Sequence, residues 1–291
     1  MLLQSILHEN IIERMSLNQT KLPTISILGC GWYGLPLGKN LFSLGYQVKG
    51  STTSESKLQL LQTEGIKPFL VQIEDKNNPV CPPEFLDSDV LILNIPPKRR
   101  DDIEDYYFRQ MQTLLSLVQN SKIKKIIFIS STSVYPDKNT QTDEVLDLFP
   151  DKPSGKALLK AEKLFLDCQK LDVLILRFAG LIGNDRNPGR FLAEKRDLKD
   201  GNAPVNLVHL DDCIAITLLC LQKECYGEIF NVCADEHPLR KDYYRKAALQ
   251  LGLKPPEFLL EEKSTPYKIV SNDKLKKVLG YQYSHSINKG D

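Results

Sequence analysis

The sequence predicts an α/β fold built on a doubly wound parallel sheet. Short apolar segments that suit buried strands alternate with segments of helical periodicity as far as Gly180. Alternation of this kind is typical of a parallel sheet that helices cover on both faces through right-handed crossovers. Ligands of such sheets bind beyond the carboxyl ends of the strands, so a functional site is expected there.

The predicted elements follow from apolar runs and from residues that start or stop them. Strands are expected around Ile25–Leu28 and at Tyr46–Lys49, Phe69–Ile73, Asp89–Ile95, Lys125–Ile129, Val173–Arg177 and Glu228–Val232, with Ala203–Val208 extended. Helices are expected at Leu35–Leu44, Glu55–Glu64, Asp101–Asn120, Lys156–Gln169, Asp211–Gln222, Arg240–Leu251 and Asp273–Leu279. Ser54 and Asp211 suit N-caps, and Gly45 and Gly280 suit the position after a helix.

The first predicted strand runs directly into a glycine-rich turn. Gly29, Gly31 and Gly34 follow the strand in G-x-G-x-x-G spacing, and a helix begins at Leu35. In a dinucleotide-binding turn the first glycine permits the tight turn, the second leaves room for the pyrophosphate, and the third lets the helix pack closely. The helix N-terminus then faces the phosphates. The alternative is a glycine-rich turn that binds nothing.

Five predicted strand ends should therefore meet at one crevice, namely Gly29–Gly34, Ser51–Thr53, Asn94–Pro97, Ser130–Thr132 and Phe178–Gly180. From these ends we take the candidate cofactor-binding residues Gly29, Gly31, Trp32, Tyr33, Gly34, Ser51, Thr52, Thr53, Lys57, Ile95, Pro96, Pro97, Ser130 and Phe178.

The end of the second strand favours NADP over NAD as the cofactor. NAD is usually held by an acidic residue about 20 positions after the glycines. Here the strand leads into Ser51, Thr52, Thr53 and Ser54 with no acidic residue before Glu55, and Lys57 adds a cation. Hydroxyls and a cation suit a 2′-phosphate that a carboxylate would repel. The alternative is that the Ser/Thr run only caps the next helix.

The composition of the chain argues against several classes of protein. The 291 residues are 42% hydrophobic and 26% charged, with a net charge of +1, which argues against nucleic acid or an anionic membrane as the main partner. No apolar run reaches the roughly 18–20 residues of a membrane span. Seven scattered cysteines without a C-x-x-C pair predict reduced thiols in a cytoplasmic protein. Four histidines lack ligand spacing, so no metal site is expected.

Several motifs occur together in a characteristic order: ILGCGWYG, IIFISSTSVYP, LRFAGLIG, VNLVHLDDCIAIT and GEIFNVCADEHPLRKDYY. On these motifs the chain resembles the extended short-chain dehydrogenase/reductases, the NAD(P)-dependent epimerase/dehydratase family, over roughly residues 24–285. The resemblance implies a Rossmann domain at 23–180 after an extension at 1–22. It also implies a smaller mixed α/β substrate-binding portion at 181–291, with some strands returning to the Rossmann sheet. A homodimer through the helices expected at 101–120 and 156–169 is implied as well.

The resemblance also implies a catalytic Ser or Thr at Ser131 or Thr132, but the family's Tyr-x-x-x-Lys pair is missing. If Lys160 is the family's Lys, then Lys156 stands at the Tyr position. A register shifted by two residues places Ser154 and Leu158 there instead. The chain is thus similar to atypical family members. Tyr135 is a substitute proton donor, and the alternative is that it packs over the substrate loop.

Three further residues are candidates for binding a substrate. Arg186 and Arg190 follow LRFAGLIG at the expected mouth of the crevice, where a guanidinium suits a phosphate or carboxylate. The alternative is that they belong to a surface loop. The resemblance implies that the segment around His209 joins a strand to a helix near the substrate portion, so His209 either lines the substrate site or has a structural role. We expect an NADP-dependent oxidoreductase of the epimerase/dehydratase type that acts on a small polar or sugar-derived molecule. The alternatives are a non-catalytic NADP sensor and a vestigial fold that binds no cofactor.

Overall fold

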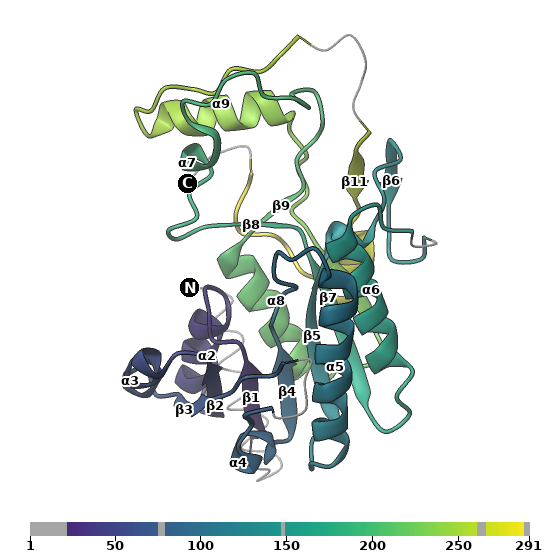
Figure 1. Ribbon diagram of the computed structural model, residues 1–291. Helices are drawn as coiled ribbons and strands as arrows, with labels where there is room; N and C mark the ends of the chain where they lie inside the picture. The colour runs from purple at the N-terminus through teal and green to yellow at the C-terminus, as the bar shows by residue number, and fades with distance from the viewer. Residues whose placement is uncertain (1–21, 75–78, 147–148, 261–265, 288–291) are drawn as a thin grey trace. The chain divides into compact units, whose positions relative to one another are not determined.

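The computed structural model describes residues 22–74, 79–146, 149–260 and 266–287, and the expected extension lies almost wholly outside them. The chain forms a central sheet of seven strands in the order β10-β7-β5-β4-β1-β2-β3. Figure 1 shows this sheet with helices packed around it. The strands are β1 (Thr24–Leu28), β2 (Gln47–Thr52), β3 (Lys67–Leu70), β4 (Val90–Leu93), β5 (Lys125–Ser131), β7 (Asp172–Phe178) and β10 (Ile229–Val232). The predicted Rossmann-type parallel sheet is confirmed.

Parallel pairing fixes the register of the first strands. β1 pairs with β2 and β4, so that Ile27 lies opposite Gly50 on one side and Ile92 on the other. All four residues of β4 are buried, which requires cover on both faces of the sheet. The main covering helices are α2 (Gly34–Ser43), α3 (Leu58–Thr63), α5 (Ile103–Gln119), α6 (Pro153–Leu166) and α8 (Leu210–Gln222).

Neighbouring helices are joined by polar contacts. Lys160 of α6 forms an ion pair with Glu104 of α5 at 2.6 Å, and the two helices lie side by side in Figure 1. The Tyr33 hydroxyl lies 2.7 Å from the Thr217 hydroxyl of α8, which ties the start of α2 to that helix. None of the helices in the described ranges is long and apolar enough to cross a bilayer.

The chain divides into two compact units. The first comprises Met1–Ser130, Lys156–Leu176 and Thr217–Ile229 as far as these are described, and the second comprises Ser131–Gly155, Arg177–Ile216 and Phe230–Asp291. The second unit adds the two-stranded pairings of β6 (Thr140–Thr142) with β11 (Lys268–Val270) and of β8 (Gly180–Ile182) with β9 (Leu207–His209). Its further helices are α7 (Gly189–Leu192), α9 (Arg240–Gln250) and α10 (Asp273–Leu279), and α4 (Pro83–Leu86) belongs to the first unit.

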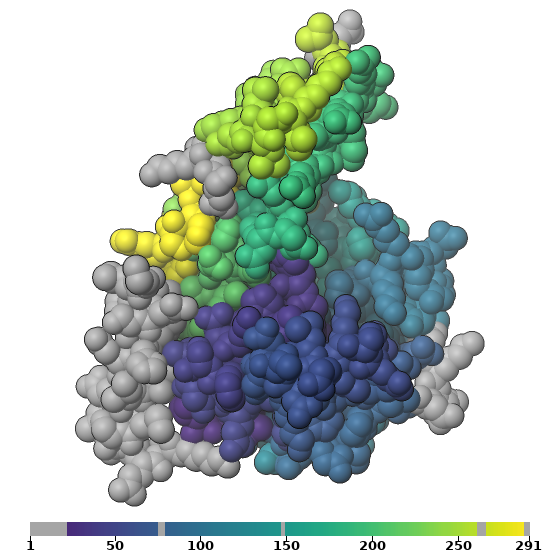
Figure 2. Space-filling view, turned by 90° about the vertical axis from the view of Figure 1, so that its left-hand side faces the viewer, coloured from purple at the N-terminus to yellow at the C-terminus, as the bar shows by residue number. Residues whose placement is uncertain are grey.

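Close packing in the second unit joins α7 to α9. A Cβ atom on Gly189 would lie 2.3 Å from the Ala247 carbonyl oxygen, so only glycine allows the two helices to approach this closely. In Figure 2 the yellow-green surface that includes α9 adjoins the green surface of the segment that includes α7. The core of the unit gathers Ile182, Val205, Leu207, Ala234, Tyr243 and Ile287.

Some predicted boundaries were wrong for physical reasons. The second strand continues to Thr52 because Gly50 stays in the ladder, where a Cβ atom would lie 2.6 Å from the Ile66 side chain and 2.7 Å from the Cys30 sulfur. Gly50 thus permits close packing and does not begin a loop. α6 begins at Pro153, because proline suits the first turn of a helix. Ser54 stands before a 3-10 turn but forms no capping bond with its side chain.

Candidate functional site

The turn after β1 is held by the ends of two neighbouring strands. The Gly29 N–H donates to the Ser51 hydroxyl at 2.8 Å, and the Cys30 N–H donates to the Ser51 carbonyl at 2.9 Å. On the other side, the Asn94 amide donates to the Gly29 carbonyl at 2.8 Å. The carboxyl ends of β1, β2 and β4 therefore meet, as parallel pairing requires.

The three glycines of the turn have different surroundings. Gly29 has a φ of 106°, and a Cβ atom there would lie 2.4 Å from the Asn94 carbonyl oxygen. On Gly34 a Cβ atom would lie 2.2 Å from the Gly29 carbonyl oxygen. On Gly31 a Cβ atom would meet no described atom within 4 Å, and its φ lies outside the left-handed region. Packing therefore explains Gly29 and Gly34, whereas nothing within the described protein requires glycine at position 31.

The aromatic residues predicted to bind cofactor differ in exposure. Tyr33 is buried, and its hydroxyl contacts Thr217. Trp32 is partly exposed beside it. Tyr33 thus contributes its side chain to the packing between the turn and α8.

The hydroxyls at the end of β2 divide into two groups. Ser51 is 2% exposed and holds the glycine turn, and the Thr52 hydroxyl accepts from the Ser54 N–H at 3.1 Å. Thr53 and Lys57 are exposed, so their polar groups face solvent. Of the residues predicted to contact a 2′-phosphate, the structure leaves Thr53 and Lys57 most accessible.

The next strand ends are partly occupied by protein contacts. The Ile95 carbonyl accepts from the buried Tyr107 hydroxyl at 2.8 Å, whereas Pro96 is exposed and Pro97 is partly exposed. Ser130 is buried and donates to the Glu162 carboxylate of α6 at 2.5 Å. Phe178 is buried and belongs to the second unit.

Tyr135 lies in a buried hydrogen-bond network within the second unit. Its hydroxyl donates to the Asn231 side-chain oxygen at 2.8 Å and accepts from the Arg177 guanidinium at 2.8 Å. Burial raises the pKa of Tyr135 to about 12, although Arg177 and Asn231 oppose the rise. The Tyr135 hydroxyl therefore both donates and accepts a hydrogen bond within the protein. This favours the interpretation that Tyr135 is a packing residue and not the proton donor.

The neighbouring candidates Ser131 and Thr132 begin a short 3-10 turn. The Ser131 hydroxyl accepts from the Ser133 N–H at 3.2 Å and is partly exposed, whereas Thr132 is buried. A Cβ atom on Gly155 would lie 2.2 Å from the Ser133 carbonyl oxygen, so the start of α6 packs directly on this turn.

The orientation of α6 bears on the two alignments of the missing Tyr-x-x-x-Lys pair that the sequence left open, Lys156 with Lys160 and Ser154 with Leu158. Leu158 and Glu162 are buried and lie four residues apart on one face, whereas Lys156 and Lys160 are exposed. Because Glu162 reaches the end of β5 through Ser130, this face is turned toward the sheet. The structure therefore favours Ser154 and Leu158 at the positions of the missing pair.

A cavity of about 250 Å³ lies beside the Ser131 turn. Its lining includes Ser131, Thr132, Tyr135, Asn206 and Lys268. The Lys268 ammonium donates to the Asp137 carboxylate at 2.7 Å and to the Tyr135 carbonyl at 3.0 Å. The pairing of β11 with β6 brings Lys268 to this place from far along the chain, which is why sequence reasoning missed it.

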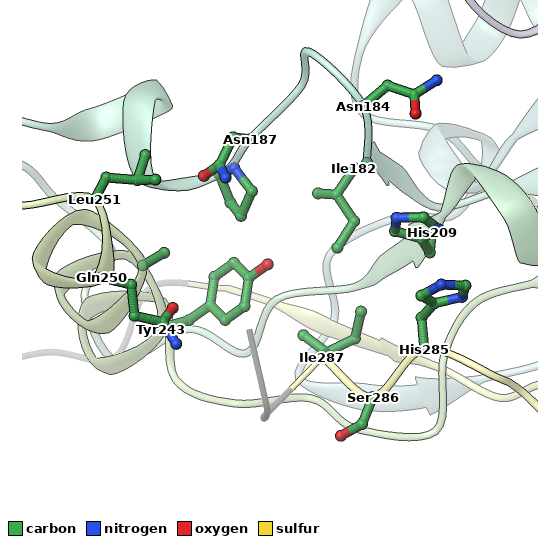
Figure 3. Close-up of a pocket in the computed structure, with 13 residues that line it drawn as sticks. Ile182, Asn184, Asn187, His209, Tyr243, Gln250, Leu251, His285, Ser286 and Ile287 are labelled. Atoms are coloured by element: carbon green, nitrogen blue, oxygen red, sulfur yellow. The ribbon is translucent and has the colours of Figure 1, made fainter. Parts of the chain in front are cut away.

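A second cavity, of about 180 Å³, lies between α9 and the ends of β8 and β9 (Figure 3). Its polar lining comprises Asn184, Asn187, His209, Tyr243, Gln250, His285 and Ser286. Of the residues predicted to bind substrate, only His209 lines it; Arg186 and Arg190 are exposed on the adjoining segment. The described lining carries no Lys, Arg, Asp or Glu side chain, so the cavity suits a neutral ligand.

His209 and His285 stack at one side of this cavity, with ring centroids 3.8 Å apart and planes 17° apart (Figure 3). The His209 Nδ1 atom accepts from the Asp211 N–H at 3.2 Å. His209 therefore caps α8, and the prediction of Asp211 as the N-cap was wrong, because Asp211 lies within the first turn. Ligand atoms of His209, Asp211 and His285 lie within 4.8 Å of one another, but in stacked rings the nitrogen lone pairs run side by side instead of converging on an ion.

The buried Asp212 carboxylate orients His285. It lies 3.1 Å from the His285 Nδ1 atom and accepts from the Tyr281 hydroxyl at 2.7 Å and from the Ser284 N–H at 2.8 Å. Since a carboxylate only accepts, the His285 Nδ1 atom donates to Asp212, and the Nε2 atom lies 3.6 Å from the Asp211 carboxylate. Nothing in the spacing of Asp212 and His285 along the chain indicates this arrangement.

Comparisons with known proteins support the family resemblance. A family model described as the NAD dependent epimerase/dehydratase family matches residues 96–233. Protein YeeZ of Escherichia coli strain K12 is 36% identical over 265 residues, which are 90% of this chain and 96% of YeeZ. The uncharacterized UDP-glucose epimerase YtcB of Bacillus subtilis is 26% identical over 136 residues, 42% of this chain and 43% of YtcB.

A solved structure shares the whole fold. The UDP-glucuronic acid 4-epimerase of Bacillus cereus in complex with NAD superposes with a TM-score of 0.74 at 22% identity, covering 92% of this chain and 95% of that one. Together with the parallel seven-stranded sheet and the motifs in their order, these matches establish the relationship. The chain belongs to the NAD-dependent epimerase/dehydratase family, as an atypical member of the extended short-chain dehydrogenase/reductases.

Proposed function

We propose that the protein binds NADP at the carboxyl ends of β1, β2 and β4 and acts on a small polar or sugar-derived substrate. The observation that carries the proposal is the bare backbone at Gly31. Gly29 and Gly34 are needed for packing, but Gly31 faces open space, which is what the approach of a pyrophosphate requires. The start of α2 supports the same interpretation, because no side chain caps it and no acidic residue stands in its first turn.

The preference for NADP rests on the end of β2. Thr53 and Lys57 are exposed there, and the strand offers no carboxylate for a ribose hydroxyl. Ser51 contributes by holding the glycine turn, since its hydroxyl is bonded to the Gly29 N–H. When bound, the cofactor would donate or accept a hydride, and the residues of this chain would bind and orient the cofactor.

The sugar-derived substrate is inferred from the family. The Bacillus cereus relative in complex with NAD is a UDP-glucuronic acid 4-epimerase, and YtcB is described as a UDP-glucose epimerase. The cavity beside Ser131 has the polar groups that such a substrate needs, with the Lys268 ammonium among them. Because burial and two hydrogen bonds occupy the Tyr135 hydroxyl, we do not assign proton transfer to it.

A non-catalytic NADP sensor is the second candidate. It is favoured by α6, where buried Leu158 faces the sheet at the position of the usual lysine. An apolar side chain there cannot lower the pKa of a proton donor. The two candidates share the cofactor site and differ only in turnover.

Titration calorimetry with NADPH and with NADH tests both candidates. We expect NADPH to bind more tightly and Gly31→Asp to abolish binding, because a carboxylate would meet the pyrophosphate. Lys57→Ala should weaken NADPH by roughly tenfold and leave NADH unchanged, as loss of one charge-assisted hydrogen bond predicts. Lys170→Ala, an exposed lysine between α6 and β7, is the matched control. Absence of binding by the folded wild-type protein would refute both candidates.

We also propose a cytoplasmic location and a homodimer through α5 and α6. All seven cysteines are free thiols, which suits a reducing compartment. Sedimentation velocity would test the dimer, and a monomer at micromolar concentration would count against it.

A further inference from the structure

The last turn of α8 brings two cysteines together. The Cys225 N–H donates to the Cys220 carbonyl at 3.1 Å, the Glu224 N–H donates to the Leu221 carbonyl at 3.3 Å, and Glu224 has a φ of 52°. These two bonds around a left-handed residue define a Schellman motif. Cys220 and Cys225 occupy the two positions of that motif whose side chains normally contact each other.

The backbone bond between residues 225 and 220 brings the two thiols close together, because residues at these positions of the motif pack against each other. Cys220 is buried, whereas Cys225 is partly exposed. One thiol is therefore accessible to a small reagent and the other lies behind it. Both belong to the first unit, so no movement between units is needed to join them.

Electrostatics assign different roles to the two sulfurs. The hydrogen bond from Cys220 and the charge of Lys223 lower the pKa of Cys225. The bond to Cys225 and burial raise the pKa of Cys220. Because Cys225 is also the partly exposed member of the pair, it is assigned as the nucleophile, and the buried Cys220 behind it is placed to resolve an oxidised Cys225.

We propose that Cys220 and Cys225 form a peroxide-reactive dithiol that closes to a disulfide. The Cys225 thiolate attacks hydrogen peroxide, so that an S–O bond forms, the O–O bond breaks, and hydroxide leaves and takes up a proton as water. The Cys220 sulfur then gives up its proton and attacks the Cys225 sulfur. The S–S bond forms, the S–O bond breaks, and the second oxygen leaves as water.

Hydrogen peroxide is the oxidant and accepts the electrons that the two thiols lose. The two thiols together lose two electrons and two protons, and one peroxide is reduced to two water molecules. A backbone bond from residue 225 to residue 220 already holds the two residues next to each other, as disulfide closure requires.

Peptide mapping by mass spectrometry after hydrogen peroxide treatment tests the proposal on the full chain. The expected result is a linkage between the Cys220 and Cys225 peptides that dithiothreitol reverses, with the other five cysteines still free to alkylate. In Cys220→Ala, Cys225 should instead give a sulfenic acid that dimedone traps. Dominant linkage of another cysteine pair, or oxidation that dithiothreitol does not reverse, would overturn the proposal.

The rate at which iodoacetamide labels each cysteine of the wild-type protein gives a second test that needs no variant. Cys81 is the matched control, because it is also partly exposed but burial raises its pKa to about 11. Near neutral pH, iodoacetamide should label Cys225 at least about tenfold faster than Cys81, since the thiolate is the reactive form. Equal rates would contradict the assigned roles.

Discussion

The buried carboxylate of Asp212 offers a stability test with a control one residue away. Asp212→Ala removes an acceptor that the Tyr281 hydroxyl, the Ser284 N–H and hydroxyl, and His285 all contact. Tyr281 is buried, so its hydroxyl cannot turn to water, and the Ser284 N–H is fixed by the backbone. Two donors left without an acceptor, at about 1–3 kcal/mol each, predict a loss of about 2–6 kcal/mol in the free energy of unfolding.

Asp211→Ala is the control because Asp211 stands in the same first turn of α8 with its side chain 61% exposed. Both substitutions remove a negative charge from a helix N-terminus, which contributes about 0.3–1 kcal/mol. The difference between the two variants therefore isolates the buried network.

Urea unfolding followed by circular dichroism measures the difference. Trp32 is the only tryptophan in the chain and lies in the first unit, so its fluorescence reports that unit separately. We expect Asp212→Ala to lose at least about 2 kcal/mol more than Asp211→Ala. A difference below about 1 kcal/mol would refute the view that Asp212 organises its surroundings.

Two further predictions concern the glycine turn and the half-buried His237. Gly34→Ala should lower the thermal midpoint and reduce the free energy of unfolding by about 1–3 kcal/mol or more, because its Cβ atom would lie 2.2 Å from a backbone oxygen. Gly31→Ala should change the free energy of unfolding by no more than about 0.5 kcal/mol. Equal losses for the two variants in scanning calorimetry would contradict the difference in packing. Burial lowers the pKa of His237 below its usual 6.5, so the unfolded chain binds protons more readily and stability should fall as pH drops through about 6.5 toward that lower value. His237→Gln should lessen the fall between pH 7.5 and 5.5, and an unchanged slope would rule out this contribution.

The glycine turn and the alternation of strands and helices could be predicted because their causes are local. Gly29 needs its left-handed φ for a turn that directly follows β1, and Gly280 ends α10 in the same conformation. Such requirements act within a few residues, so they leave a visible pattern in the sequence. The family resemblance added the order of the motifs, which periodicity alone does not provide.

Local patterns misled where a neighbour distant in sequence decides the role of a residue. The predicted strand ended at Lys49, but β2 continues through Gly50, where the Ile66 side chain packs against the glycine. Asp211 looked like a helix cap, yet the His209 ring takes that role. In both cases the same residue type suits two roles, and only the packed surroundings separate them.

The amino-acid sequence by itself determined the fold class and the position of the glycine-rich turn, since both depend on residues close together in the chain. Only the tertiary structure decided that no protein atom packs against the Cβ position of Gly31, that Leu158 faces the sheet, and that Asp212 orients His285. The last pair lies 73 residues apart. The physical reason is that burial and hydrogen-bond partners are properties of the packed chain, and no local pattern encodes which distant residue will supply them.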